Sequence, residues 1–517
     1  MSKKNIDIRS TNIMIQGTGS NVGKSLLTAA FCRIFKDEGF KVAPFKSQNM
    51  ALNSFVTKEG GEMGRAQAVQ AEACGVEPHT DMNPILLKPT ADKTAEVIID
   101  GKVYGDMDAV GYHDFKKKAM ASVAESYRRL SSLYEVVVIE GAGSPAEINL
   151  RENDIANMGT AHMADAPVIL VGDIDKGGVF ASLVGTLELL DEADRGRIKG
   201  FIINKFRGDV ELLRPGLDEL EKRTGLPVLG VVPYFHDIFV QEEDSLSAGS
   251  LDFNSVNLAD GAIDVAVISL PHMSNFSDFD PFYADPFVNL RFIRKGQKIG
   301  SPDVLIIPGT KSTIADLRYL KEFGYDEAIQ KYVDGGGTLV GICGGYQIMG
   351  CIVSDPEGVE SEEAVEEKGL SYFDITTVMR EGKHTVQVEA EYKEGLPFFI
   401  RGMIEGYEIH SGVSEYGEGG KPLFVINGKG DGAVSSGGRV WGTYIHGIFD
   451  NDDFRRAFVM SKLGGVSEDV YNDAQQKFLD LKEEGYRKLA SVVKESVDMD
   501  KVREIMGIDI KESVKVK

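Results

Sequence analysis

A glycine-rich stretch near the N-terminus has the composition of a phosphate-binding loop. Residues 17–25 read GTGSNVGKS and lie between an apolar run, 12–16, and an amphipathic stretch, 25–38. In such a strand–loop–helix context, glycines let successive backbone N–H groups point at anionic oxygens. Lys24 would then reach the outer phosphates of a nucleotide, and the Ser25 hydroxyl would ligate Mg2+. We therefore predict that ATP is bound by Gly17, Thr18, Gly19, Asn21, Val22, Gly23, Lys24 and Ser25.

The loop departs from the usual spacing of this motif. The pattern G-x-x-x-x-G-K-[ST] would place its first glycine at position 18, where the chain has Thr18, and Gly17 comes one residue early. We interpret the loop as a variant, because the strand, the glycines, Lys24 and Ser25 keep their order. The alternative is an ordinary glycine-rich turn between a strand and a helix.

Three further residues at the ends of predicted strands could serve the same site, because ligands of parallel sheets bind beyond the carboxyl ends of the strands. Glu140 ends the run VVVIE, and its carboxylate could hold Mg2+ or merely cap a helix. Lys46 follows KVAPF and could add positive charge to a transferred phosphoryl group, or be a surface lysine. Asn204 ends FIIN, where its amide could hydrogen-bond an adenine edge.

A second candidate site is formed by residue types that attack an amide. Residues 341–347 read GICGGYQ, so Cys343 would lie on a sharp turn between a strand and a helix, where a thiolate is favoured. His446, directly after the run VWGTY, is the predicted base. The backbone N–H groups of Gly309 and Gly344 are predicted to stabilise the oxyanion. A buried structural cysteine is the alternative.

The two candidate sites each need a series of strands that positions their residues. A length of 517 residues predicts two to four domains, which leaves room for two such series. Short apolar runs alternate with amphipathic stretches such as 25–38 and 112–133, which is typical of a doubly wound, mainly parallel α/β sheet. The predicted strands of the first series are 12–16, 41–45, 135–140, 167–172, 198–204 and 227–232, and those of the second are 263–270, 304–308, 337–343, 404–409, 423–426 and 440–444.

The domain boundaries follow from composition. Residues 242–262 are rich in Ser, Asp, Asn and Gly, as expected of a connection between domains. We therefore predict an ATPase domain at 1–241, a linker at 242–262 and a second α/β domain at 263–455. A helical segment at 456–517 is expected to pack on the second domain or to extend freely, and the acidic run at 355–369 is expected to be a solvated surface loop.

Composition narrows the class of protein. Hydrophobic residues make up 42% and charged residues 26%, which is typical of a folded globular chain. The excess of 80 acidic over 57 basic residues gives a net charge of -23 and disfavours nucleic acid and anionic membranes as partners. Four cysteines without a CxxC pair suit a reducing compartment, and no signal peptide or run of about 20 apolar residues is apparent. We expect a cytoplasmic protein that binds small molecules. The sequence leaves open whether it forms a homo-oligomer.

The first half resembles a known family. GTGSNVGKS, VIEGAG, IINKFRGD and VVPYF are similar to the dethiobiotin synthetase type of ATPase domain, whose members activate a carboxylate as an acyl phosphate. The resemblance implies that Lys24, Lys46, Ser25 and Glu140 bind phosphate and magnesium, and that Asn204, Pro233 and Tyr234 lie near adenine. It also implies Glu62, in GGEMGRAQ, as a further magnesium carboxylate, although the local motif differs.

The second half resembles the class I glutamine amidotransferase domain, through PGTKST, GICGGYQIMG, GYEIHSG and GTYIHGIFD. Members of that family usually carry a glutamate two residues after the histidine, where this chain has Ile448. Within this family the chain is most similar to the branch that amidates cobyric and cobyrinic acids. That resemblance implies that Cys343 and His446 are enough for glutamine hydrolysis without the glutamate. Glu408 or His410, in GYEIH, could instead support the histidine.

The segments at 46–55, 64–75, 83–89 and 270–282 are similar to those of the cobyric acid synthase family, over about 12–450. This resemblance implies ATP- and glutamine-dependent amidation of the b, d, e and g carboxylates of adenosylcobyrinic acid a,c-diamide in cobalamin biosynthesis. Cobyrinic acid a,c-diamide synthase is one alternative, and a P-loop partitioning or regulatory ATPase with an inactive amidotransferase-like domain is another. The corrinoid contacts implied are Gln48, Asn49, Ser274 and Asn275.

Overall fold

The computed structural model of the chain describes residues 10–91, 94–235, 238–241, 258–361 and 363–508. It divides into two compact units. The first comprises Met1–Ala51, Glu62–Glu243 and Lys482–Lys517, and the second comprises Leu52–Gly61 and Asp244–Leu481. Most of the predicted linker, 242–257, lies outside the described residues. The division differs from the predicted one in two places, because a short N-terminal segment belongs to the second unit and the end of the chain to the first.

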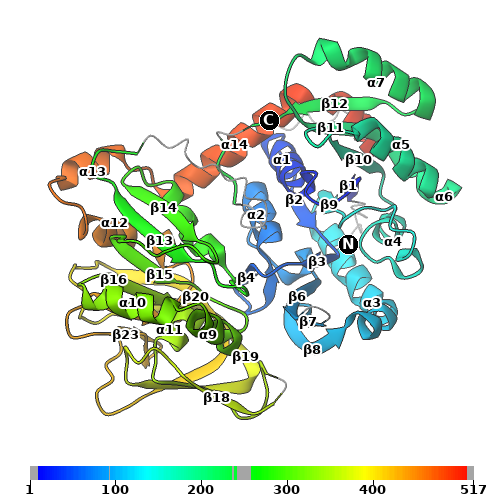
Figure 1. The fold of residues 1–517 in the computed structure, drawn as a ribbon. Coiled ribbons are helices and arrows are strands. Elements are labelled where there is room, and N and C mark those ends of the chain that lie inside the picture. Colours follow the sequence, from blue (N-terminus) through cyan, green and yellow to red (C-terminus); the bar gives the residue numbers. More distant parts are fainter. Residues whose placement is uncertain (1–9, 92–93, 236–237, 242–257, 362, 509–517) are drawn as a thin grey trace, which may run out of the picture. The chain divides into compact units, whose positions relative to one another are not determined.

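A six-stranded parallel sheet forms the centre of the first unit, in the order β12-β11-β10-β1-β9-β2 (Figure 1). Its strands match the first predicted series, and the predicted doubly wound α/β fold is confirmed. β9 is buried at every position, as expected of a strand covered on both faces. The strands are β1 (Thr11–Gly17), β2 (Val42–Phe45), β9 (Val136–Glu140), β10 (Val168–Asp173), β11 (Ile198–Phe206) and β12 (Val228–Pro233).

Helices connect these strands, and their bounds follow the amphipathic stretches of the sequence. The long helix α3 begins after Asp108, whose carboxylate accepts a hydrogen bond from the Gly111 N–H and so caps the helix. The helices of this part of the chain are α1 (Lys24–Asp37), α2 (Arg65–Cys74), α3 (Ala109–Leu133), α4 (Met158–Met163), α5 (Val179–Leu189), α6 (Glu192–Arg195) and α7 (Val210–Thr224), with 3-10 turns η1 (Thr80–Met82) and η2 (Arg151–Asn153).

A smaller four-stranded sheet, in the order β3-β6-β7-β8, belongs to the same unit. The sequence analysis did not identify it, because it interrupts the regular alternation of strand and helix with two consecutive hairpin connections. Its strands are β3 (Gln48–Met50), β6 (Ile85–Ala91), β7 (Thr94–Ile99) and β8 (Lys102–Asp108), and the short strand β5 (Glu62–Gly64) precedes α2.

Residues 456–481 belong to the second unit, as expected of the C-terminal segment, whereas the part from Lys482 on completes the core of the first unit. From Lys482 on, α14 (Phe478–Ser496) and α15 (Met499–Met506) share a buried apolar cluster with α1, and α14 is drawn in red in Figure 1. Arg33 donates to both carboxylate oxygens of Glu483 at 2.7 and 2.8 Å. Lys482 donates to Glu72 at 2.8 Å. The part from Lys482 on therefore belongs to the ATPase unit rather than being an appendage.

The second unit has its own six-stranded sheet, in the order β14-β13-β15-β16-β24-β23, parallel except for the edge strand β23. Its strands are β13 (Ile263–Ile268), β14 (Val288–Ile293), β15 (Val304–Ile307), β16 (Thr338–Ile342), β23 (Ala433–Val434) and β24 (Val440–Thr443). The helices are α8 (Asp280–Tyr283), α9 (Thr313–Glu322), α10 (Tyr325–Asp334), α11 (Gly344–Ile348), α12 (Asp452–Met460) and α13 (Glu468–Ala474), with 3-10 turns η3 (Phe276–Phe279) and η4 (Ile448–Asp450).

Two predicted strands of the second series, 404–409 and 423–426, are strands but do not join the parallel sheet. They belong to a largely antiparallel sheet in which buried and exposed residues alternate along β19, as expected of a strand with one covered face. Its strands are β17 (Ile352–Asp355), β18 (Val365–Lys368), β19 (Ile375–Tyr392), β20 (Met403–Tyr416), β21 (Phe424–Ile426) and β22 (Lys429–Asp431), and the strand β4 (Ser54–Val56) packs against β19 and β20.

The acidic run at 355–369 is not wholly a solvated loop. The fully buried Asp355 carboxylate accepts hydrogen bonds from the N–H groups of Val359, Glu360 and Ser361 at 2.7–2.9 Å.

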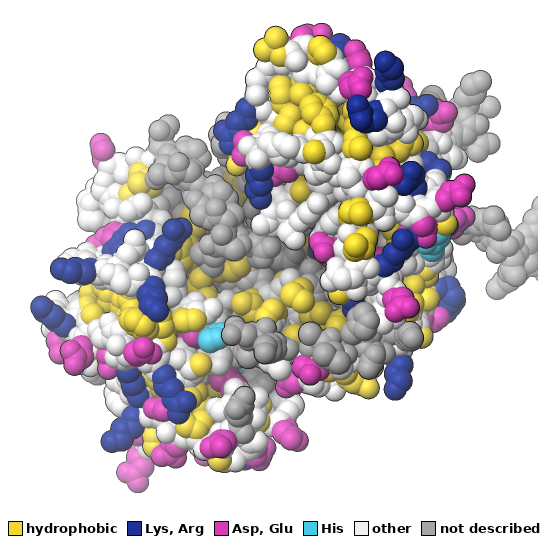
Figure 2. Space-filling view, turned by 45° about the vertical axis from the view of Figure 1, so that its right-hand side comes forward, with side chains coloured by type: hydrophobic (Ala, Val, Ile, Leu, Met, Phe, Trp, Pro, Cys, Tyr) yellow, Lys and Arg dark blue, Asp and Glu magenta, His cyan; other side chains and the backbone are white. Residues whose placement is uncertain are grey.

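On the face shown in Figure 2, basic side chains are interspersed with acidic ones. In the part of the chain that the structure describes, no helix is both long and apolar enough to cross a membrane.

Candidate functional site

The phosphate-type loop connects the end of β1 to the start of α1, which is the context expected from the sequence. The buried Lys24 ammonium donates to the carbonyl oxygens of Gly19 at 2.7 Å and Gly143 at 3.0 Å. A Cβ atom at Gly17 would lie 2.5 Å from Val22 Cγ2, so only glycine fits there. Gly23 has a φ of 99°, a left-handed conformation that favours glycine. The early glycine at position 17 therefore has a steric reason in this loop.

The Lys24 ammonium is held in an unusual electrostatic environment. Burial lowers the pKa of Lys24 to about 8, with the Glu140 carboxylate opposing this effect and the Lys46 ammonium adding to it. A buried cation without a carboxylate in direct contact is poised to gain interaction energy when an anion arrives. This makes Lys24 a suitable partner for phosphate oxygens.

Glu140, at the end of β9, accepts hydrogen bonds from several polar side chains around the loop. The Ser25 hydroxyl and the Lys46 ammonium each donate to Glu140 Oε1 at 2.8 Å, and the Gln70 amide donates to Oε2 at 2.6 Å. Burial by itself raises the pKa of Glu140, but Lys46, Gln70 and Ser25 outweigh it and hold that pKa below its ordinary value. The carboxylate is therefore ionised and lies beside a hydroxyl, a pair of oxygen ligands that suits Mg2+.

Two residues at the end of β11 hold the loop from the other side. Asn204 donates to the Val22 carbonyl oxygen at 2.9 Å, and Lys205 donates to the Asn21 carbonyl oxygen at 2.6 Å. Lys205 also pairs with Asp173 at 3.0 Å. The Asn204 amide group thus contacts the loop backbone in this structure, and its predicted contact with adenine stays a prediction. Lys205 and Asp173 were not identified from the sequence, although both lie at strand ends.

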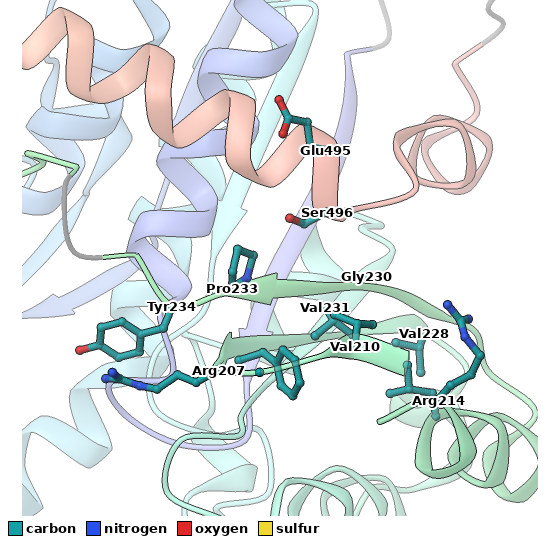
Figure 3. Close-up of a pocket in the computed structure, with 13 residues that line it drawn as sticks. Arg207, Val210, Arg214, Val228, Gly230, Val231, Pro233, Tyr234, Glu495 and Ser496 are labelled. Atoms are coloured by element: carbon teal, nitrogen blue, oxygen red, sulfur yellow. The ribbon is translucent and has the colours of Figure 1, made fainter. Parts of the chain in front are cut away.

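A pocket of about 800 Å³ lies along β12 and beside the end of β11, with Pro233 and Tyr234 among its lining residues (Figure 3). The Arg207 guanidinium carbon lies 3.7 Å from the centroid of the Tyr234 ring. Glu495 and Ser496 of α14 line the opposite wall. Phe206, which also lines the pocket, follows Asn204 by two residues along β11, so one strand contacts both the phosphate-type loop and the pocket.

The remaining residues expected in the first unit are engaged with their neighbours. The buried Glu62 carboxylate accepts from Lys88 at 2.8 Å, and its predicted role as a magnesium ligand stays a prediction. Gln48 accepts from the Tyr112 hydroxyl at 2.7 Å, and Asn49 donates to Gln67 at 2.9 Å. Among the described residues no cluster of three or more His, Cys, Asp or Glu side chains could hold a metal ion.

Cys343 lies on the sharp turn between β16 and α11 in the second unit. Its φ is 50° and its ψ is -109°, a conformation that few non-glycine residues adopt. Gly341, Gly344 and Gly345 allow this turn, because a Cβ atom at Gly345 would lie 2.0 Å from the Ile307 carbonyl oxygen. Strain of this kind is a recurrent feature of nucleophile turns.

The two glycines predicted to bind an oxyanion lie beside the cysteine. A Cβ atom at Gly309 would lie 3.0 Å from His446 Cε1 and 3.7 Å from Cys343 Cβ. A Cβ atom at Gly344 would lie 2.6 Å from Thr310 Cγ2. The fully buried Asp316 fixes this loop by accepting from the Thr310 hydroxyl at 2.5 Å. Gly309, Gly344, Cys343 and His446 therefore surround one small space.

His446 has an acidic partner that the sequence analysis did not identify. Its Nδ1 atom lies 2.7 Å from Asp278 Oδ2, and the Gly447 N–H donates to Asp278 Oδ1 at 2.9 Å. The Tyr407 ring stacks on the imidazole at 5.2 Å between centroids, and the two residues exchange backbone hydrogen bonds of 2.9 and 3.1 Å. The imidazole is therefore fixed on two sides.

This environment favours the imidazolium form. Burial opposes the charge on His446, but the Asp278 carboxylate and the neighbouring Cys343 side chain together raise the pKa of His446 to about 10. A cysteine and a buried histidine that share one proton, with an aspartate behind the histidine, can attack an amide carbonyl and then protonate the leaving nitrogen.

Comparisons with known proteins agree with this geometry. Residues 13–247 match the CobQ/CobB/MinD/ParA nucleotide binding domain, and residues 264–454 match the CobB/CobQ-like glutamine amidotransferase domain. A cobyric acid synthase of Thermoanaerobacter sp. (strain X514) is 51% identical over 96% of this chain and 98% of its own. A cobyric acid synthase of Clostridium acetobutylicum is 50% identical over 96% of this chain and 99% of its own.

The chain belongs to the cobyric acid synthase family. It is thus an amidotransferase-type ligase of cobalamin biosynthesis, and its nucleotide-binding domain implies the use of ATP. The resemblance stated from the sequence is confirmed.

In this member of the cobyric acid synthase family, Glu408 and His410 have partners other than His446 Nδ1. Glu408 pairs with His384 at 3.0 Å, and His410 donates from Nδ1 to the Gly412 carbonyl oxygen at 2.7 Å. The role of supporting His446 falls to Asp278 instead. Ile448, where related amidotransferases carry glutamate, is fully buried in the apolar core. The only signal for Asp278 was an acid flanked by Ser277 and Phe279 in the phenylalanine-rich segment NFSDFDPF, after a strand.

Ser274 and Asn275, predicted from the cobyric acid synthase family as corrinoid contacts, are buried in the second unit. The Ser274 N–H donates to the Gly309 carbonyl oxygen at 3.0 Å, and Asn275 immediately precedes η3. Both residues thus lie next to the groups around Cys343, whereas Gln48 and Asn49 belong to the first unit. Their contact with a corrinoid stays a prediction.

Proposed function

We propose that the chain converts adenosylcobyrinic acid a,c-diamide to cobyric acid, amidating the b, d, e and g carboxylates with ATP and with ammonia released from glutamine. The observation that carries this proposal is the combination of a Cys343–His446–Asp278 triad in one unit with a Lys24–Ser25–Glu140 phosphate-type site in the other. The names of the relatives supply the substrate class.

Nitrogen release is assigned to the second unit. The Cys343 thiolate adds to the side-chain carbonyl of glutamine, and the N–H groups of Gly309 and Gly344 stabilise the oxyanion. His446 donates its shared proton to the leaving nitrogen, so that ammonia departs and a glutamyl thioester remains. Water then hydrolyses the thioester with His446 as base, which releases glutamate and restores the thiolate.

Carboxylate activation is assigned to the first unit. A corrinoid carboxylate attacks the γ-phosphorus of ATP, an acyl phosphate forms and ADP leaves; ammonia then displaces phosphate and gives the carboxamide. Lys24 and Lys46 compensate charge on the transferred phosphoryl group. The Ser25 hydroxyl and the Glu140 carboxylate would hold Mg2+, which neutralises charge on the phosphate oxygens when bound.

The nucleoside is assigned to the pocket lined by Pro233 and Tyr234. Its volume of about 800 Å³ is ample for a purine, and Arg207 and Tyr234 offer a cationic and an aromatic surface for stacking. Glu62 is kept as a second candidate magnesium ligand; its carboxylate is paired with Lys88, as that of Glu140 is paired with Lys46.

The proposal is tested by incubating the enzyme with ATP, Mg2+, glutamine and each candidate corrinoid acid, and by counting the oxygen-to-NH replacements by mass spectrometry. Four replacements on the a,c-diamide are expected. Two replacements on cobyrinic acid itself, with none on the diamide, would instead identify an a,c-diamide synthase. ATP hydrolysis without glutamine hydrolysis would identify a regulatory or partitioning ATPase, a role that the intact triad disfavours.

A further inference from the structure

A short segment from the N-terminal half of the chain takes part in the second unit. Leu52–Gly61, here called the strap, follows β3 and precedes β5, yet it is grouped with Asp244–Leu481. Two residues, Met50 and Ala51, separate it along the chain from Asn49, which belongs to the polar network around Glu140 through Gln67. The strap is therefore a piece of the ATPase half of the sequence that the amidotransferase unit holds.

The strap is bound to the start of the turn that carries Asp278. The Phe276 N–H donates to Asn53 Oδ1 at 3.0 Å, and in return the Ser54 N–H donates to Asn275 Oδ1 at 3.2 Å. Asn275 has a φ of 52°, and its carbonyl oxygen accepts from the Asp278 N–H at 3.0 Å. Asn53 and Asn275 are each 1% exposed. These reciprocal bonds fix the backbone two residues before Asp278.

The strap also contacts the second support of the catalytic histidine. Val56 forms a buried apolar cluster with Tyr407 and Ile409, and the Phe55 ring lies 6.2 Å from the Tyr407 ring. The Gln387 amide donates to the Val56 carbonyl oxygen at 2.9 Å. Tyr407 is the residue that stacks on His446. Both groups that orient the imidazole, Asp278 and Tyr407, are therefore supported by the strap.

We propose that Asn53 is a positioning residue of the glutaminase site: through the Phe276 N–H it places the Asp278 carboxylate at the distance and angle that hold His446 Nδ1. This inference rests on the proposed glutaminase function. Asn53 touches neither glutamine nor the reacting atoms; its effect passes through Asp278. A shift of the turn by about 1 Å is enough to cost on the order of 10²-fold in rate.

The reason for assigning this role to Asn53 rather than to the strap as a whole is geometric. Its side-chain oxygen replaces a backbone acceptor at the first N–H of η3, which would otherwise have no partner within the turn. Asn53 is therefore a cap supplied from outside the turn. Loss of this acceptor frees the first N–H of the turn, two residues before Asp278 in the same turn.

The test uses the full-length enzyme and the variants Asn53→Ala, Asn53→Ser and Asn53→Asp. Asn53→Ala removes the acceptor oxygen, Asn53→Ser keeps a hydroxyl that is too short to reach the Phe276 N–H, and Asn53→Asp keeps an oxygen in place. Glu59→Gln, at an exposed position of the strap, is the matched control. Each variant is measured for glutamate release from glutamine, for ammonia-dependent amide synthesis and for thermal unfolding.

We expect Asn53→Ala and Asn53→Ser to lower kcat for glutamate release by about 10-fold to 100-fold with a smaller change in KM. The alkaline limb of their pH profile should move to lower pH, since His446 loses part of the stabilisation that Asp278 gives its charge. Asn53→Asp should restore both kcat and the limb, and Glu59→Gln should behave as wild type. Ammonia-dependent synthesis should be unchanged in all four variants.

A double-mutant cycle with Asp278→Asn separates a positioning role from a general structural one. If Asn53 acts through Asp278, Asn53→Ala adds little to the loss already caused by Asp278→Asn. Losses that simply multiply, or an unshifted pH profile in the folded Asn53→Ser enzyme, would overturn the proposal. A wild-type enzyme that releases no glutamate would contradict the proposed function itself, which is a distinguishable result.

Discussion

His446 and Asp278 form a buried pair in the amidotransferase unit: Nδ1 lies 2.7 Å from Oδ2 across 168 residues of sequence. The second carboxylate oxygen accepts from the Gly447 N–H, so Asp278 holds both the ring and the backbone that follows it. This contact orients the imidazolium so that Nδ1 faces the carboxylate and the other ring nitrogen is free to exchange a proton with Cys343. It supplies what the glutamate two residues after the histidine supplies in related domains.

The first prediction concerns this contact. Asp278→Asn should lower glutamate release from glutamine on the order of 10³-fold, because the imidazolium loses its counter-charge. The Asp278 carboxylate is one of the groups that raise the pKa of His446 to about 10, so its removal lowers that pKa. The shared proton is then lost at lower pH, and the alkaline limb of the activity profile should move down. A pH series of glutamate release measures both effects.

Ammonia-dependent amide synthesis is the internal control for Asp278→Asn, since it bypasses the triad. Synthesis from ammonia at the wild-type rate, together with an unchanged alkaline limb for glutamate release, would show that Asp278 does not stabilise the charge on His446.

The second prediction concerns Lys24. Lys24→Ala should lower amide synthesis by on the order of 10³-fold or more with glutamine and with ammonia alike, because the phosphoryl group loses a buried positive charge. The exposed Lys199→Ala is the matched control and should retain full activity. Amide formation at close to the normal rate by a folded Lys24→Ala enzyme would mean that the loop is only structural.

The third prediction concerns Glu140. Glu140→Gln should raise the Mg2+ concentration at half-maximal synthesis by about 10-fold or more, because an amide oxygen binds a hard cation less well than a carboxylate. The variant should also unfold at a lower temperature, since the buried Lys46 loses its charged partner. A magnesium titration with unchanged midpoint and rate would remove Glu140 from the metal site.

The fourth prediction concerns Asn204. Asn204→Ala removes the hydrogen bond to the Val22 carbonyl oxygen, which should weaken ATP binding by about 1 kcal/mol, or about fivefold. The steady-state KM for ATP in ammonia-dependent synthesis measures this loss. Glutamate release without ATP should be unaffected. A fall in glutamate release as large as the rise in KM would instead point to general unfolding.

Much of the fold could be predicted because the two parallel sheets consist of short, fully buried apolar runs. β9 and β16 are buried at every position, and such runs between helices indicate parallel strands directly. The antiparallel strands β19 and β20 were harder, because their long-range pairing leaves only a half-buried alternation in the sequence. The strap could not be predicted, since nothing local marks a ten-residue segment as belonging to a distant unit.

The candidate sites divide in the same way. The residues of the phosphate-type loop and Cys343 follow strands within a compact motif, so local spacing was enough to find them. Asp278 is 168 residues from His446, and only the tertiary fold brings the two together. For Glu62, where only the family resemblance implied a magnesium ligand, the structure adds a partner that the sequence did not reveal, Lys88 from another strand, and the predicted metal role stays a prediction.

The central claim is that nitrogen release and carboxylate activation are separate reactions of separate units. The most direct measurement is amide synthesis by Cys343→Ser, assayed with glutamine and, in parallel, with ammonia at high concentration and a pH at which free NH3 is appreciable. We predict that synthesis from glutamine is lost and that synthesis from ammonia continues at close to the wild-type rate. A folded Cys343→Ser enzyme that still uses glutamine, or that can use neither nitrogen source, would contradict this division.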